Sequence, residues 1–222
     1  MTRKIDELIR SDRRTISLTV QDGRLVVRAP KRAPMAVILR FIEEKDDWIA
    51  KRQTADREML AACPAHTYLD GERFLYRGEA YRLQRDPTVH RIRCENGQLR
   101  IPDWAAADCP ARLERWYRAR AKEAFVADAE ALSLRLFVPC PRISLSSAKT
   151  RWGSCSAKNS VCLAWRLIMA PPEVLRYVVL HELCHIKEKN HQAGFWALVA
   201  SVDPDWRQKR QWLSDNGRTL YL

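Results

Sequence analysis

The stretch "VVLHELCHIKEKNHQAGFW", residues 178–196, decides how this sequence is interpreted. Three of the five histidines of the chain, His181, His185 and His191, lie in this short segment. The residues leading into it are apolar on nearly every side, which predicts a buried helix that carries the first two histidines. Because positions i and i+4 share one face of a helix, the side chains of His181 and His185 are expected to point the same way.

Two imidazoles one helical turn apart can bind a single metal ion, with zinc–nitrogen distances of about 2.0–2.1 Å. Glu182 follows the first histidine but is displaced around the helix, so its carboxylate can reach a water on the metal instead of the metal itself. Two imidazoles and a carboxylate buried without partners would be strongly destabilising, and a metal offsets that cost. The alternative, ordinary polar core or surface residues, fits this apolar context less well. The pattern therefore predicts an H-E-x-x-H zinc site.

A catalytic zinc site has three protein ligands and a water, and His191 is the candidate for the third ligand. A continuous helix would carry His191 roughly 9 Å along its axis from His185. The helix must therefore end soon after His185, and His191 must fold back at the start of the next helix. Should His191 not be the ligand, the next candidates are Glu188, Asp203 and Asp205.

The spacing H-E-x-x-H-x5-H equals that of the metzincins, but two features disagree. Glu188 stands where those enzymes need a glycine, and no methionine follows Met169 to form a Met-turn. The segment "RWGSCSAKNSVCLAWRLIMAPPEVLRYVVLHELCHIKEKNHQAGFW" (151–196) instead resembles the signature of the YgjP-like metal-dependent hydrolases. This zincin family is related to the SprT-like and WLM metallopeptidases. The stretches "RLVVRAP", "DDWIAKRQ" and "GERFLYRGEAYRL" also match it in kind and order, so the resemblance covers nearly the whole chain.

The resemblance implies a zinc-dependent hydrolase, most simply a metallopeptidase, with one zinc ion per chain. By position, the family's metal ligands correspond to His181, His185 and His191, and its catalytic glutamate corresponds to Glu182. Some members are described as pyrophosphatases acting on UTP, so a nucleotide substrate at the same metal site is the alternative. A third hypothesis is a nucleic-acid-associated metal-binding protein, based on charge and the SprT-like kinship.

Two segments beside the motif suggest how a substrate could bind. Arg151, in "RWGSC", could approach the site and stabilise an oxyanion or a phosphate oxygen, or could be a solvated residue next to a packing turn. The predicted strand at 159–170 is placed to bind an extended peptide by edge pairing.

Composition limits the class of protein. The 222 residues carry a formal net charge of +12, with 46% hydrophobic and 30% charged residues. No apolar stretch is long enough for a transmembrane helix and no signal-peptide pattern begins the chain, so we expect no membrane partner. The seven scattered cysteines argue against a disulfide framework, and together these features predict a cytoplasmic protein. The positive charge is spread over both halves, as a solvated surface or an attraction to a polyanion such as nucleic acid.

The predicted fold class is α+β, with a β-rich region at 1–105 followed by a zincin-like domain at 106–222 that contains the H-E-x-x-H helix. The expected elements are hairpins at 15–30, 67–86 and 90–102, two strands at 141–156 and 159–170, and helices at 34–53, 109–138, 170–186, 192–201 and 204–217. In the helix at 109–138, one side carries Arg112, Arg115, Arg118 and Lys122, which we interpret as a solvated basic face.

Overall fold

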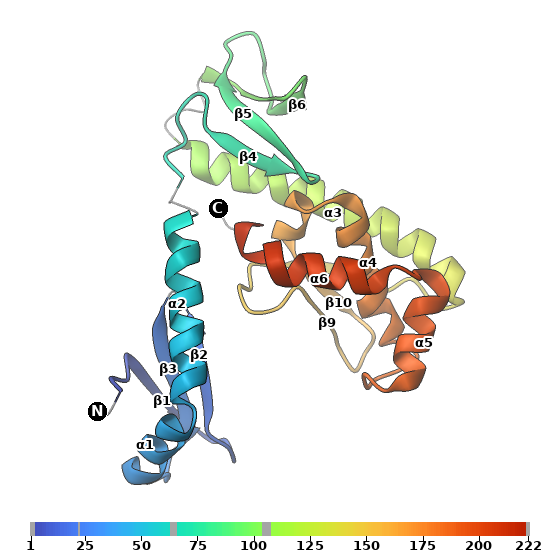
Figure 1. Cartoon of the computed structure of the whole chain (residues 1–222). Coiled ribbons are helices and arrows are strands. Elements are labelled where there is room, and N and C mark those ends of the chain that lie inside the picture. Colours follow the sequence, from blue (N-terminus) through green and yellow to red (C-terminus); the bar gives the residue numbers. More distant parts are fainter. Residues whose placement is uncertain (1–2, 22, 63–65, 104–107, 221–222) are drawn as a thin grey trace. The chain divides into compact units, whose positions relative to one another are not determined.

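A computed structural model describes residues 3–21, 23–62, 66–103 and 108–220 and shows a mixed α+β protein (Figure 1). The chain divides into two compact units, Met1–Ala65 and His66–Leu222, each with its own apolar core. The change of sequence character near residue 105 therefore lies inside the second unit. Within the described ranges, no helix has both the length and the apolar character needed to cross a membrane.

The first unit contains a three-stranded sheet in the order β1-β3-β2 and two helices. Its elements are β1 (Glu7–Ser11), β2 (Ser17–Gln21), β3 (Arg24–Pro30), α1 (Met35–Glu44) and α2 (Asp46–Ala62). The predicted hairpin at 15–30 is confirmed as the antiparallel pair β2–β3. The strand β1, which pairs parallel with β3, was not predicted because parallel pairing joins segments that are distant in sequence.

The helix expected at 34–53 is two helices. The break lies at Lys45, which caps α1 with a non-helical backbone and donates its N–H to the carbonyl of Ile42. The apolar pattern continues across this break: Ile42 before it and Ile49 after it both lie in the core of the first unit. A hydrophobic pattern alone therefore could not reveal where the first helix ends.

The second unit begins with a four-stranded sheet in the order β4-β5-β7-β6. The strands are β4 (Arg73–Tyr76), β5 (Glu79–Arg85), β6 (Arg93–Glu95) and β7 (Gln98–Ile101). Both predicted hairpins are confirmed, with two-residue turns at Arg77-Gly78 and Asn96-Gly97. All four turn residues have positive φ, as tight hairpin turns of the primed type require.

The long helix α3 (Cys109–Leu136) packs one buried stripe against this sheet and against the rest of the second unit. The phenol of Tyr117 is fully buried and donates a 2.8 Å hydrogen bond to the carbonyl of Leu75 on β4. The turn between β4 and β5 also packs against residues 168–169, which lie further along the chain in the same unit. The N–H groups of Arg77 and Gly78 donate to the carbonyls of Ile168 and Met169, each at 2.9 Å.

A second sheet, in the order β8-β10-β9, lies next to the helix that carries the histidine motif. Its strands are β8 (Ile143–Ser146), β9 (Gly153–Cys155) and β10 (Val161–Ala164). The strand expected at 159–170 is shorter, because a 3-10 helix, η2 (Trp165–Met169), follows Ala164 directly. Since β10 pairs with β8 on one side and β9 on the other, it cannot receive a peptide by edge pairing, so that prediction is wrong. The edge strand beside the motif helix is β9.

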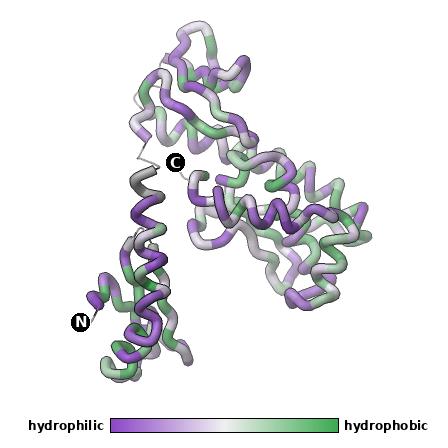
Figure 2. Tube along the Cα trace, viewed as in Figure 1, coloured by the Kyte–Doolittle hydropathy of each residue, from purple (hydrophilic) through white to green (hydrophobic). Residues whose placement is uncertain are grey.

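The chain ends with helices around the motif. These are α4 (Pro172–Cys184), α5 (Ala193–Val202), α6 (Trp206–Asn216) and the 3-10 helix η3 (Gly217–Leu220). The helix α4 packs against α3, α5 and α6 and is buried over most of its surface. Hydrophobic residues gather where α3, α4 and α5 pack, whereas α6 is more hydrophilic (Figure 2).

Candidate metal centre

The end of α4 sets the positions of the motif side chains. The last helical residue is Cys184, and His185 is the C-cap, so the helix ends where the spacing of the histidines required. The backbone then turns through 186–190, with the N–H of Glu188 donating to the carbonyl of Cys184 at 2.9 Å. This turn returns the chain toward α4 and places His191 just before α5.

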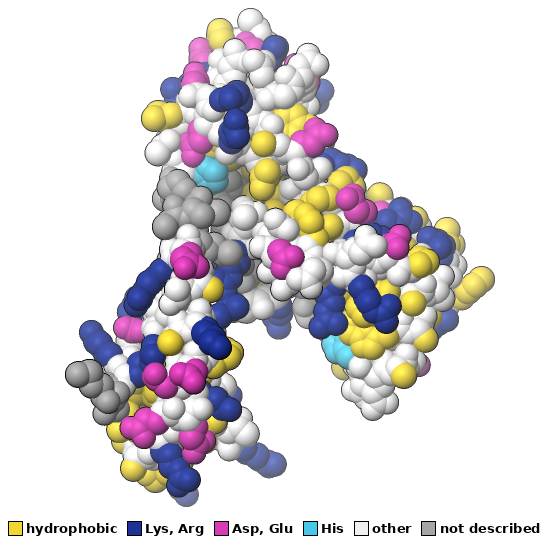
Figure 3. All heavy atoms as spheres, in the orientation of Figure 1, with side chains coloured by type: hydrophobic (Ala, Val, Ile, Leu, Met, Phe, Trp, Pro, Cys, Tyr) yellow, Lys and Arg dark blue, Asp and Glu magenta, His cyan; other side chains and the backbone are white. Residues whose placement is uncertain are grey.

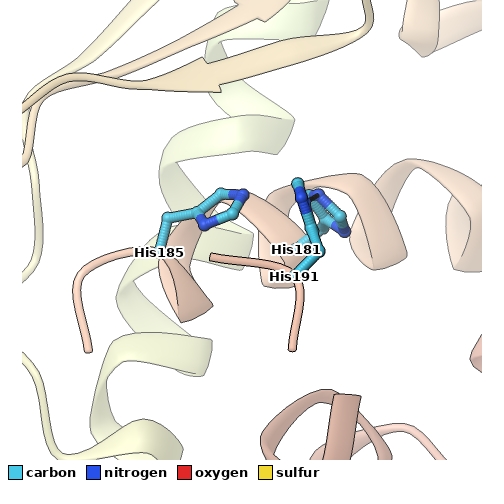
Figure 4. Close-up of side chains that lie close together, drawn as sticks. All are labelled: His181, His185 and His191. Carbon is cyan, nitrogen blue, oxygen red and sulfur yellow. Dashed lines mark hydrogen bonds between the residues drawn. The ribbon is translucent and has the colours of Figure 1, made fainter. Parts of the chain in front are cut away.

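The structure brings the three predicted histidines together (Figure 4). Each offers a ring nitrogen, and these nitrogens all lie within 4.8 Å of one another. The Nε2 atoms of His181 and His191 are 3.0 Å apart. Two nitrogen ligands of a tetrahedral zinc ion would lie about 3.3 Å apart, given zinc–nitrogen distances of about 2.0–2.1 Å. The arrangement therefore fits a metal ion without large movements of the rings.

The second ring nitrogens of His185 and His181 differ in their hydrogen bonding. His185 Nδ1 lies 3.0 Å from the backbone carbonyl of Glu188, so Nδ1–H can donate there and leave Nε2 unprotonated. His181 Nδ1 is buried and has no hydrogen-bond partner in the part of the chain that the structure describes. With its Nδ1 protonated, His181 would likewise present an unprotonated Nε2 toward the other rings.

Aromatic rings of α5 hold the histidines from one side. The ring of Phe195 is fully buried, and its centroid lies 4.6–4.9 Å from the centroids of all three imidazoles. Trp196 stacks on His191 with centroids 5.7 Å apart, and the guanidinium of Arg210 lies 5.1 Å from the Trp196 ring centroid. No pattern in the sequence indicated that Arg210 would lie beside the histidines.

Comparisons with known proteins identify the family of this chain. A family model described as "YgjP-like, metallopeptidase domain" matches residues 14–216. The chain belongs to the YgjP-like family. The resemblance inferred from the sequence is therefore confirmed. UTP pyrophosphatase from Escherichia coli (strain K12) is 34% identical over 71 residues, which cover 30% of this chain and 42% of that protein. The match thus spans less than half the length of this curated relative.

Burial controls protonation in the centre of this YgjP-like chain. Burial lowers the pKa of His181 to about 3, and the charges of His185, His191 and Arg210 add to this effect. The pKa of His191 is also lowered, again mainly by burial. Both imidazoles are therefore neutral at pH 7, which is the form that binds a metal.

The carboxyl of Glu182 has the opposite shift. Its side chain is only 6% exposed, and burial raises its pKa to about 7, although the charge of Arg151 works against the rise. A nearby divalent cation would lower this pKa. A carboxylate whose pKa lies near the working pH is suited to taking up and releasing a proton.

The position of Glu182 depends on a glycine of β9. A Cβ atom added to Gly153 would lie 2.5 Å from Glu182 Oε1 and 2.6 Å from its Cγ, closer than real Cβ contacts allow. The carboxylate therefore lies directly against the backbone of the edge strand. The sequence pointed to the "RWGSC" segment but did not show that its glycine and Glu182 would touch.

Arg151, two residues before the start of this strand, is exposed, and its charge is close enough to act on Glu182. The alternative ligand candidates are placed differently. Asp203 forms a 2.5 Å ion pair with Lys209, and Asp205 is an exposed residue at the start of α6. Glu188 takes part through its backbone carbonyl, while its carboxylate lies near Gly194.

Proposed function

We propose that this YgjP-like chain is a zinc-dependent hydrolase in which His181, His185 and His191 hold one zinc ion and Glu182 is the general base. The observation that carries the proposal is the convergence of three ring nitrogens, together with the buried Glu182 that follows His181 on the same helix. The family model, which describes a metallopeptidase domain, favours a peptide bond as the bond that is hydrolysed.

Bound zinc supplies Lewis-acid chemistry, which acidifies water and polarises the bond under attack. Glu182 would accept a proton from the attacking water and pass it to the leaving group. Arg151 is proposed to stabilise the negative charge that develops on the substrate, because its charge already acts on Glu182. The closely packed Phe195 would keep the imidazoles in place during the reaction.

An extended peptide has a natural place along β9. This strand is the edge of its sheet, it packs against α4, and Gly153 within it contacts Glu182. A peptide that pairs with the edge of β9 that faces away from β10 would therefore run past the proposed general base.

A nucleoside triphosphate is the second candidate substrate. It is favoured by the similarity to the E. coli protein named UTP pyrophosphatase. In that reaction Arg151 would contact a phosphate oxygen, a role for which a guanidinium is well suited.

Both candidates depend on Glu182, so one pair of variants tests the common mechanism. Glu182→Gln should keep the zinc content of the wild type and lower hydrolysis by roughly 10²–10⁴-fold, because the amide cannot accept the proton. Glu173→Gln is the matched control, because Glu173 is an exposed residue in the first turn of the same helix. Each protein is assayed for cleavage of a denatured protein and for pyrophosphate release from a panel of nucleoside triphosphates.

The assays separate the possible outcomes. Peptide cleavage that disappears only in Glu182→Gln supports the metallopeptidase, and pyrophosphate release with the same dependence supports the second candidate. Full hydrolysis by Glu182→Gln would reject the proposed base. Wild-type protein that binds no zinc in elemental analysis would reject the metal centre.

A further inference from the structure

A second site is suggested by a cavity of about 700 Å³ between β6 and the first half of α3. One wall is formed by residues 91–95, in and before β6, and the other by the face of α3 between Arg112 and Arg120. The side chains that face it from α3 recur at helical spacing, three or four residues apart. A cavity of this size can hold a small organic ligand.

The cavity is strongly basic. The arginines that line it are Arg91, Arg93, Arg112, Arg115 and Arg120. Among the described residues that line it, the only acidic side chain is Glu95, and its carboxylate lies 3.7 Å from Arg100. Arg120 is held by a 2.5 Å ion pair with Glu123, whereas Arg91, Arg93 and Arg115 are exposed. Several guanidinium groups around one concave surface favour a ligand with more than one negative charge.

The structure divides the basic face that the sequence suggested for α3. Arg118 donates to the hydroxyl of Ser147 at 2.8 Å, and Lys122 donates to the carbonyl of Ile143, so both contact the β8 region. Arg112 and Arg115 line the cavity instead. Arg115 and Lys122 are exposed, as the predicted solvated face requires, but tertiary contacts give the two sides of the helix different surroundings.

Aromatic rings form part of the same wall. Tyr76 and Trp116 both line the cavity, with ring centroids 4.9 Å apart, and both are half-buried. Exposed ring surface beside guanidinium groups is the combination that binds a planar base next to a phosphate.

We propose that this cavity binds nucleotide units, in which a phosphate is attached to a sugar and a planar base. The site is distinct from the histidine centre. The cavity lies on the first half of α3, whereas α4 approaches its second half, where Arg176 donates to Asp128 at 3.4 Å. The same chemistry could come from single-stranded nucleic acid or from a free nucleotide, and a spread of arginines over one open cavity favours the strand.

The test compares two double variants of the full chain that change the net charge equally. Arg93→Glu/Arg115→Glu reverses charge in the cavity. Arg73→Glu/Arg142→Glu reverses charge at two exposed positions outside it. Binding of a fluorescein-labelled ten-nucleotide oligo(dT) is measured by anisotropy between 25 and 200 mM KCl, after circular dichroism has shown that both variants fold.

We expect the cavity variant to bind at least about tenfold more weakly than the control variant at low salt. The slope of log affinity against log salt should also become shallower by about 0.7 for each phosphate that the variant no longer neutralises. Equal affinities and slopes for the two variants would overturn the proposal. Since no turnover is measured, this result does not depend on whether the histidine centre hydrolyses anything.

Competing ligands show whether the cavity binds a strand or a free nucleotide, and whether the rings of Tyr76 and Trp116 contribute to binding. Displacement of the oligonucleotide by UMP would assign the site to free nucleotides as well, and displacement only by unlabelled oligo(dT) would assign it to a strand. An abasic ten-mer keeps the phosphates without the bases and should bind at least about fivefold more weakly than oligo(dT). Equal binding of the abasic strand would overturn the assignment to nucleotide units.

Discussion

The helices α4 and α3 of the second unit place their polar residues in different surroundings. The helix α4 is buried over most of its surface, and His181 near its C-terminus converges with His185 and His191 on one centre. The helix α3 is more than twice as long, buries a single stripe, and distributes basic residues between a cavity and the β8 region. On a buried helix each polar residue needs a partner, so its presence is informative. On a partly exposed helix a charge can simply be solvated, so only its surroundings show what it does.

Basic residues are also spread over the surface of the molecule, as they are along α3. Figure 3 shows Lys and Arg side chains scattered over the visible face, without one continuous block. The net charge of +12 therefore did not locate a site, whereas the shape between β6 and α3 did.

The largest expected effect is on metal binding by His181, His185 and His191. His191→Ala should abolish stoichiometric zinc binding, because two imidazoles remain where a catalytic site needs three protein ligands. Elemental analysis of the purified protein is the measurement, and His90→Ala, at an exposed position outside the cluster, is the control. A chelator should then lower the melting temperature of the wild type but leave that of His191→Ala unchanged. Retention of zinc by His191→Ala would contradict the role of His191 as a ligand, and with it the contrast between α4 and α3.

The next effect tests the contact between α4 and β9. In Gly153→Ala the new methyl group must displace Glu182, and a displacement of about 1 Å can lower turnover by about 10²-fold. Zinc content should not change, because the three heavy atoms nearest to the added methyl group all belong to Glu182. Gly194→Ala is the control, since a Cβ there would lie 3.5 Å from Glu188, an ordinary contact. Wild-type turnover in Gly153→Ala would show that this close approach has no role.

The third expected effect is on stability and concerns the buried hydroxyl of Tyr117 on α3. Tyr117→Phe removes the hydrogen bond to the Leu75 carbonyl within the buried stripe and should lower the free energy of unfolding by about 0.5–1.5 kcal/mol. Tyr81→Phe should change it by less than about 0.5 kcal/mol, because its partner, Glu79, is exposed. Chemical denaturation measures both. Equal losses would show that burial does not distinguish these hydroxyls.

The smallest effect comes from a carboxylate outside both helices and depends on pH. Burial alone would raise the pKa of Glu72, but hydrogen bonds from Thr67 and His66 outweigh burial and hold the pKa below 4.5. A depressed folded-state pKa stabilises the protein above the unfolded-state value, and this contribution is lost as the pH falls through the folded-state pKa. The difference in unfolding free energy between wild type and Glu72→Gln should therefore be constant near neutral pH and shrink below about pH 4.5. A difference that grows in acid would contradict the direction of the shift.

Local patterns were enough for much of this fold. Asn96-Gly97 predicts its hairpin because both residues tolerate positive φ. Helical spacing predicts that His181 and His185 share a face, and the distance to His191 requires the helix to end where α4 ends. Each of these conclusions follows from the geometry of a few consecutive residues.

Tertiary structure decided the features that join distant segments. The parallel partner of β3, the place of β9 at the sheet edge and the approach of Gly153 to Glu182 depend on which strands pair and which helix covers them. The separation of Arg115 from Arg118 likewise depends on what packs on each side of α3. The sequence by itself determined that His181 and His185 of the histidine motif share one face of a helix, because residue spacing along a helix fixes direction. Only the packed structure determined the surroundings of that motif, because contacts between remote residues leave no periodic signal in the chain.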